Sequence, residues 1–211
     1  MNERLCVIFG AGQTFAPRHK FGADDLVIAA DGGYETVRKL GIEPDVVIGD
    51  FDSMSGGKEP TDTDAHIVKL KVDKDDTDML AAVKLGLRRG YSTFVLYGGV
   101  GGRLDHTVAN IAALDYLNAF GGRGFLIDES SVSTVITDDK FVVPRGAQGT
   151  VSVFAYGGEA TGVTLKNLKF PLDNATLTPD FPLGVSNSVV AGDKRAEISV
   201  KNGSLLIFFP R

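Results

Sequence analysis

The chain has 211 residues, of which 43% are hydrophobic and 23% charged, a globular composition that excludes a disordered or fibrous protein. Its 27 acidic and 22 basic side chains give a formal net charge of −5, so a nucleic acid is not an expected partner. No apolar run approaches the roughly 18 residues that a membrane span needs, and the single cysteine, Cys6, cannot form an intrachain disulfide. The first apolar stretch, Leu5–Phe9, runs into glycines like a β-strand, so we predict a cytoplasmic protein without a signal peptide or a membrane partner.

Through residue 130, short apolar runs alternate with helical patterns, as in a parallel sheet with crossover helices. The expected strands are LCVIF, LVIAA, DVVIG, HIVKL, TFVLYG and GFLID. Helices are expected over residues 34–40, 78–89 and 104–119, the last two from apolar residues at spacings of three and four. The sequence therefore predicts a Rossmann-like α/β domain over residues 1–130.

From residue 131 the pattern changes to alternating strands without a convincing helix. The expected strands are SVSTVIT, KFVVP, GTVSVFAY, VTLKNLKF, AEISVK and SLLIFF, separated by Gly, Pro, Asn and Asp. This spacing predicts a second domain over residues 131–211, a small antiparallel sandwich or barrel.

Aspartates follow the strands of the first domain, where ligands of open α/β sheets bind, so we expect their carboxylates to converge. They are Asp31, Asp50, Asp52, Asp75, Asp76, Asp78 and Asp105. Asp50 and Asp52 flank Phe51, and in an extended segment both side chains would point the same way and could grip one cation. Mg²⁺ is the natural partner of an all-oxygen set that also binds phosphates. A lone aspartate is more simply a helix cap or turn residue, but several in corresponding positions favour a metal site.

The segment KDDTDML opens the predicted helix over residues 78–89. Asp75 and Asp78 are three residues apart, which places them near one another on the first turn. Either Asp75 or Thr77 is expected to cap this helix, which leaves the remaining acidic side chain for a metal or a substrate proton.

The segment YGGVGGRLDH lies between a predicted strand and a predicted helix, a position where glycine N–H groups can approach phosphates and Arg103 would add a positive charge. The simpler alternative is a tight turn that needs positive φ. FGAGQ, after the first strand, is a weaker candidate of the same kind, and neither segment completes a Walker A or GxGxxG pattern. For His106 we expect a structural hydrogen bond rather than a proton shuttle. His19 and His66 show no spacing typical of a zinc site.

Four segments carry a resemblance: ADGGYETVRKLGIEPDVVIGDFDSM, KDDTDMLAAVKLG, YGGVGGRLDHTVANI and LGVSNSVV. In this order and spacing the chain resembles the thiamine pyrophosphokinase family over nearly its whole length. The resemblance implies transfer of the pyrophosphoryl group of ATP to the hydroxyl of thiamine, which gives thiamine diphosphate and AMP. It also implies that the second domain is a β-sandwich, with Mg²⁺ as cofactor and a homodimer with its active sites between subunits.

The resemblance further implies roles for particular residues. The expected Mg²⁺ ligands are Asp50, Asp52, Asp75 and Asp105. The expected ATP-site residues are Asp31, Gly32, Thr77, Asp78, Gly99, Gly101, Gly102 and Arg103, with Asp78 as a candidate base. Ser186 and Asn187 belong to the segment that the family offers to thiamine. Two alternatives remain open at this point: a diphosphotransferase acting on another small alcohol such as a pterin, and a nucleotide-binding sensor without enzymatic activity.

Overall fold

A computed structural model of the chain describes residues 4–18, 20–51, 60–71, 75–190, 192 and 194–211. The chain divides into two compact units, Met1–Glu129 and Ser130–Arg211, which we call the N-terminal unit and the C-terminal unit. No helix in the described part of the chain is both long enough and apolar enough to cross a membrane.

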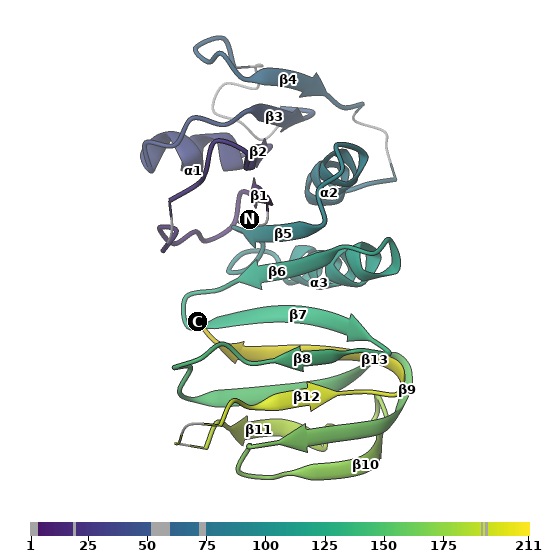
Figure 1. Ribbon diagram of the computed structural model, residues 1–211. Helices are drawn as coiled ribbons and strands as arrows, with labels where there is room; N and C mark the ends of the chain where they lie inside the picture. Colours follow the sequence, from purple (N-terminus) through teal and green to yellow (C-terminus); the bar gives the residue numbers. More distant parts are fainter. Residues whose placement is uncertain (1–3, 19, 52–59, 72–74, 191, 193) are drawn as a thin grey trace. The chain divides into compact units, whose positions relative to one another are not determined.

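The N-terminal unit is built on a sheet whose neighbouring strands are parallel, in the order β4-β3-β2-β1-β5-β6 (Figure 1). Its strands are β1 (Leu5–Phe9), β2 (Leu26–Ala30), β3 (Val46–Gly49), β4 (His66–Lys69), β5 (Thr93–Tyr97) and β6 (Arg123–Ile127). Its helices are α1 (Gly33–Lys39), α2 (Asp78–Arg88) and α3 (Leu104–Ala119). All three predicted helices are therefore present, each within one residue of its expected ends.

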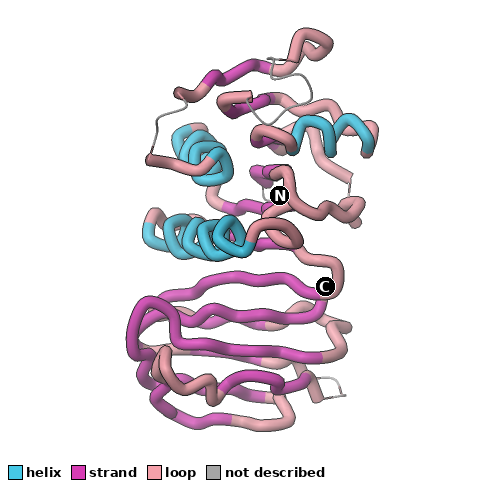
Figure 2. Tube along the Cα trace, turned by 180° about the vertical axis from the view of Figure 1, so that it is seen from behind, coloured by secondary structure: helices cyan, strands magenta, loops and turns pink. Residues whose placement is uncertain are grey.

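Helices cover both faces of this sheet. Helix α1 lies on one face, and α2 and α3 lie on the other, as the two opposite views show (Figures 1 and 2). Strands β1, β2 and β3 are almost wholly buried, which explains their continuous apolar sequences, whereas the edge strand β4 is partly exposed.

The order of the strands reverses beside β1. The chain builds outward from β1 to β4, and α2 then contacts β3, β2 and β1 on its way back to β5, which pairs with the other side of β1. Loops that follow the two strands at such a reversal diverge and leave a crevice at their carboxyl ends. The topology therefore places a ligand site after β1 and β5.

The C-terminal unit contains antiparallel strand pairs in two sheets that share one long strand, β9. Its strands are β7 (Ser131–Thr137), β8 (Lys140–Val142), β9 (Thr150–Lys166), β10 (Leu172–Leu177), β11 (Gly184–Ser188), β12 (Glu197–Ser199) and β13 (Asn202–Pro210). The first half of β9 pairs with β13 and β11, and its second half pairs with β10 and β12.

The prediction of two separate strands, GTVSVFAY and VTLKNLKF, is wrong at this point, because β9 contains nearly all of the first run and the first four residues of the second. Gly157 and Gly162 have φ values of 71° and 69°, which glycine adopts readily, and the register with β13 shifts between Tyr156 and Thr161. The strand can therefore bend and change partners without a break. Strands β10 and β11 were not predicted, because their sequences LDNATL and GVSNS lack the alternation of apolar residues.

Candidate functional site

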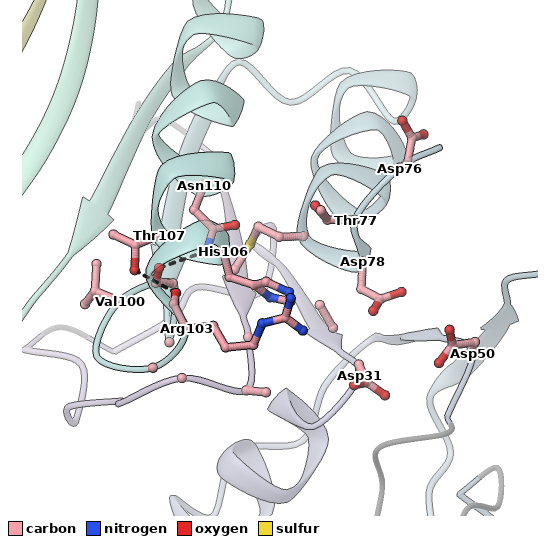
Figure 3. A pocket seen from close by; sticks show the side chains of 18 residues that line it. Asp31, Asp50, Asp76, Thr77, Asp78, Val100, Arg103, His106, Thr107 and Asn110 are labelled. Atoms are coloured by element: carbon pink, nitrogen blue, oxygen red, sulfur yellow. Dashed lines mark hydrogen bonds between the residues drawn. The ribbon is translucent and has the colours of Figure 1, made fainter. Parts of the chain in front are cut away.

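A cavity of about 620 Å³ lies in the N-terminal unit at the carboxyl ends of the parallel strands. Its walls come from the segments that follow β1, β2, β3 and β5 and from the first turns of α2 and α3 (Figure 3). This is the position that the reversal of strand order predicts. Side chains of opposite charge line its two sides, and we call these the acidic side and the glycine side.

The acidic side carries three aspartates from three different elements, Asp31 after β2, Asp50 after β3 and Asp78 at the start of α2. Their carboxylates face one region of the cavity (Figure 3). Asp31 has a φ of 47°, a conformation that asparagine and aspartate adopt more readily than most residues, and its N–H donates to the carbonyl oxygen of Ile48 over 2.8 Å. Asp31 and Asp50 are therefore held at the ends of two paired strands.

The start of α2 resolves which residue caps that helix. Thr77 is the N-cap, and its side-chain oxygen accepts a hydrogen bond from the N–H of Leu80 over 3.2 Å. Asp76 also lines the cavity, but its carboxylate accepts hydrogen bonds from Lys84 Nζ over 2.6 and 2.7 Å and points away from the other aspartates (Figure 3). This bond raises the pKa of Lys84. Asp75 is not among the described residues that line the cavity.

The glycine side consists of two loops that lie against each other. Gly10 and Gly12 follow β1, and their N–H groups donate to the carbonyl oxygens of Tyr97 and Gly98 over 2.8 Å each. Gly98 has a φ of 66°, and a Cβ added there would lie 2.3 Å from the carbonyl oxygen of Gly10. Only glycine fits this close approach of two backbones. The glycines therefore support both interpretations given above. The turn needs a positive φ, and the loop also lines the cavity, where its N–H groups could approach a phosphate.

Arg103 and His106 add a basic character to the glycine side from the beginning of α3 (Figure 3). The guanidinium of Arg103 donates two hydrogen bonds to the carboxylate of Asp105, from Nε over 3.1 Å and from Nη2 over 2.5 Å. These bonds lower the pKa of Asp105 and raise that of Arg103. Asp105, an expected metal ligand, lies outside the cavity lining, and its carboxylate forms an ion pair with Arg103.

A structural hydrogen bond was expected for His106, and within the described residues only its backbone makes one. Its imidazole lines the cavity and makes no hydrogen bond in the described part of the chain, while its backbone N–H donates to Asp105 over 3.0 Å. His106 therefore offers a side chain to a ligand, as Arg103 does.

The remaining expected site residues of the N-terminal unit are Asp52 and four glycines. Asp52 lies outside the described residues. Phe51 has a φ of 64°, so the segment that joins Asp50 to Asp52 is not extended there, and the argument from strand alternation fails. Gly99 and Gly102 line the cavity, whereas Gly32 and Gly101 are not part of its lining.

Ser186 and Asn187 belong to β11 of the C-terminal unit. Asn187 is 3% exposed, and its amide both accepts from the N–H of Phe170 over 2.9 Å and donates to the carbonyl oxygen of Phe170 over 2.6 Å. Ser186 is exposed and has a φ of 58°. In this structure the side chain of Asn187 therefore holds two segments of the C-terminal unit together.

The acidic side suits a hard cation by its oxygen chemistry. Within the described residues, no three carboxylate, imidazole or thiol groups lie close enough to form a complete metal site. Mg²⁺ does not require such a cluster, because it keeps several water ligands and is usually held by one or two carboxylates together with substrate phosphates. Asp31, Asp50 and Asp78 fit that kind of site.

Asn110 belongs to the site but was not predicted from the sequence. Asn110 lies on the buried face of α3 with Ala113, Leu114 and Leu117, and it also lines the cavity. The signal was available as a single polar residue at an apolar position of the helical pattern, which indicates a buried hydrogen bond.

An open parallel sheet with glycine loops, an arginine and opposing carboxylates at its point of reversal is typical of the class of α/β proteins that bind phosphorylated ligands. Comparison with known families makes this class specific. Residues 18–121 match the family described as thiamin pyrophosphokinase, catalytic domain, and residues 140–205 match the family described as thiamin pyrophosphokinase, vitamin B1 binding domain.

Individual relatives agree with these matches. The chain is 26% identical over 187 residues to the thiamine pyrophosphokinase of Bacillus subtilis (strain 168), covering 86% of each chain. Its fold matches the crystal structure of thiamine pyrophosphokinase from Bacillus subtilis with a TM-score of 0.86, at 24% identity and 99% coverage of both chains. The crystal structure of the Geobacillus thermodenitrificans protein of the same name matches with a TM-score of 0.85, at 25% identity and coverage of 98% of this chain and 97% of that one. The chain belongs to the thiamin pyrophosphokinase family.

Proposed function

We propose that the cavity of the N-terminal unit is the site where this enzyme cleaves ATP. The chain is an enzyme with thiamine pyrophosphokinase activity, which transfers the pyrophosphoryl group of ATP to the hydroxyl of thiamine and releases AMP. The observation that carries the assignment of the site is the pairing of three carboxylates with a glycine loop and Arg103 across one cavity. Neither a pterin acceptor nor a sensor without activity is favoured by any feature of the site.

The charges on the two sides suit a bound triphosphate. Arg103, His106 and the glycine loop supply hydrogen-bond donors for phosphate oxygens, whereas Asp31, Asp50 and Asp78 would repel the same oxygens unless a cation lay between them. We therefore assign Mg²⁺ to the acidic side, held by Asp50 with Asp31 or Asp78, and Asp52 stays a predicted ligand. When bound, Mg²⁺ would neutralise charge on the phosphate oxygens as the bond between the α- and β-phosphates breaks.

Pyrophosphoryl transfer demands mainly that the reacting groups be positioned and that charge be stabilised. Arg103 would hold phosphate oxygens, with its guanidinium oriented by Asp105. Asp78 lies on the acidic side, and we propose that its carboxylate accepts the proton of the thiamine hydroxyl. The same carboxylates would attract the positive charge of the thiazolium ring.

We assign ATP binding to a Rossmann-like N-terminal domain and thiamine binding to a β-sandwich C-terminal domain, in line with the two family matches. Ser186 stays the proposed thiamine contact of the second domain, and Asn187 would act by shaping the same segment. We further propose a homodimer. Large apolar side chains are exposed in both units, among them Leu104 at 77% and Phe181 at 64%, and an interface would cover such groups. A cytoplasmic location is consistent with Cys6, a free and buried thiol whose pKa is raised by burial.

The test is an assay of AMP formation from ATP with and without thiamine, in Mg²⁺ and again in EDTA, with the product identified by mass. We expect AMP and thiamine diphosphate in equal amounts, only when both thiamine and Mg²⁺ are present. Folded protein that releases no AMP with thiamine would refute the proposal, and light scattering of the same sample tests the dimer.

A further inference from the structure

The glycine loop after β5 is held by hydrogen bonds to three consecutive carbonyl oxygens. Two of the donors are backbone groups of the loop after β1. The N–H of Gly12 donates to the carbonyl oxygen of Gly98 over 2.8 Å, and the N–H of Gln13 donates to that of Val100 over 3.0 Å. The carbonyl oxygen between these two, that of Gly99, needs a donor from elsewhere.

Asn110 supplies this third donor from α3. Its Nδ2 donates to the carbonyl oxygen of Gly99 over 2.8 Å, and the residue is only 7% exposed (Figure 3). A Cβ added at Gly99 would lie 3.1 Å from the same Nδ2, so the helix and the loop are in direct contact. A buried amide costs free energy unless its hydrogen bond is made. Asn110 therefore serves its bond to the loop rather than the apolar packing of α3.

The three bonds also orient the donors of the loop. A peptide group is planar and trans, so its C=O and N–H point in opposite directions, and holding one fixes the other. The held peptides carry the N–H groups of Gly99, Val100 and Gly101. None of these N–H groups donates to an acceptor within the described ranges of the chain. Consecutive N–H groups without an internal acceptor, in a loop that lines a cavity, are suited to an anion such as a polyphosphate.

We propose that Asn110 is a positioning residue for the phosphate chain of the nucleotide, which acts by fixing the Gly99 peptide. The proposal rests on the function assigned above, because it takes ATP as the ligand of the cavity. Asn110 could act by positioning the nucleotide or only by stabilising the fold, and the two roles predict different results. A positioning role predicts weaker binding of the triphosphate and unchanged use of thiamine, whereas a purely structural role predicts lower stability of α3 with unchanged affinity for the nucleotide.

The experiment replaces Asn110 by leucine, which has a similar shape but no donor, and measures binding of α,β-methylene-ATP with Mg²⁺ by calorimetry. This analogue cannot be cleaved between its α- and β-phosphorus atoms, so binding is measured without turnover. We expect Asn110→Leu to raise the Kd about tenfold, the effect of losing one buried hydrogen bond. The KM for thiamine should change less than about twofold, as expected for a role confined to the nucleotide.

Two further variants make the test specific. Ala113→Gly, on the same buried face of α3 but outside the cavity, destabilises the helix without touching the loop and should leave the Kd unchanged. Asn110→Ser keeps a hydroxyl donor and should recover part of the affinity, and it replaces Asn110→Leu if that variant does not fold. An unchanged Kd for the Asn110 variants, or an equal loss in Ala113→Gly, would overturn the proposal. If the wild-type protein binds the analogue but forms no AMP with thiamine, the proposed pyrophosphokinase reaction is refuted. The comparison of Kd values between the wild type and the Asn110 variants still tests the role of Asn110.

Discussion

The acidic side and the glycine side of the cavity are built in different ways. The acidic side gathers Asp31, Asp50 and Asp78 from three elements, so its chemistry exists only when the sheet and α2 are assembled (Figure 3). The glycine side takes its loop, arginine and imidazole largely from one continuous segment, residues 98–106. Substitutions on the acidic side should therefore remove activity from a stable protein, whereas those in the glycine loop should also disturb the backbone.

The largest effect is expected for Asp50→Asn, which removes a negative charge from the acidic side without changing its shape. We expect kcat/KM for AMP release to fall about a thousandfold, the scale of losing one electrostatic contact to the transition state. The melting temperature should stay within about 2 °C, as for a substitution outside the core. Asp173→Asn makes the same charge change on exposed β10 and serves as the control. Retention of a tenth of the wild-type activity by Asp50→Asn would contradict the assignment of the acidic side.

A pair of glycine substitutions tests the other side. Gly98→Ala places a Cβ 2.3 Å from the carbonyl oxygen of Gly10 at a φ of 66°, whereas a Cβ at Gly102 meets no atom within 4 Å. We expect Gly98→Ala to lose about 3 kcal/mol of unfolding free energy, which is roughly 6–12 °C in melting temperature. Gly102→Ala should change the melting temperature by less than about 2 °C. Equal melting temperatures for the two variants would show that the loops do not pack as described.

Asp105→Asn distinguishes a residue that orients Arg103 from a metal ligand. We expect the Kd for the ATP analogue to rise about fivefold, because the guanidinium loses a charge-assisted partner. The Mg²⁺ concentration for half-maximal activity should not change. Arg103→Ala should cause the larger loss, and adding Asp105→Asn to it should cause little more. A large rise in the Mg²⁺ requirement of Asp105→Asn would restore the metal role predicted from the sequence.

The pH dependence of this pair follows from its chemistry. The bond to Arg103 lowers the pKa of Asp105, so the carboxylate stays ionised as the pH falls through the usual range for aspartate. The pair is lost only when the pH falls through the lowered pKa. The ratio of the Kd values of Asp105→Asn and wild type should therefore stay constant from pH 8 to about pH 5. A ratio that drops to one well above pH 5 would show that the pair does not act on the nucleotide.

The smallest effect is expected for Thr77→Ala, which removes the cap of the helix that carries Asp78. Loss of the bond to the N–H of Leu80 should cost about 1 kcal/mol, or roughly 2–4 °C in melting temperature. Thr77→Ser keeps the acceptor and should melt close to the wild type. If Thr77→Ala melts at the same temperature as Thr77→Ser, the cap does not stabilise the helix that carries Asp78.

Much of the N-terminal unit was predictable because its signals are local. Continuous apolar runs predicted its described strands, helical spacing predicted α2 and α3, and the strand ends indicated where ligands would bind. The C-terminal unit was harder, since β9 changes partners at its glycines and β11 is held by the buried amide of Asn187. Neither feature has a periodic signature.

The candidate site was predictable in part. Asp31, Asp50, Thr77, Asp78 and Arg103 all line the cavity, as expected from their places after strands and at helix starts. Asp75 and Asp105 satisfy the same rule but do not line it. Position along the chain places a residue near the site, whereas the direction of its side chain depends on local partners such as Arg103.

The sequence by itself determined the order of strands and helices in the N-terminal unit, the family, and most of the residues from which the site is built, because these depend on composition, periodicity and motif. Only the tertiary structure decided which carboxylates face one another, that Asp105 binds Arg103, and that Asn110 holds the glycine loop. The physical reason is that these contacts depend on backbone direction and on burial, which arise when segments distant in the chain are brought together by the sheet.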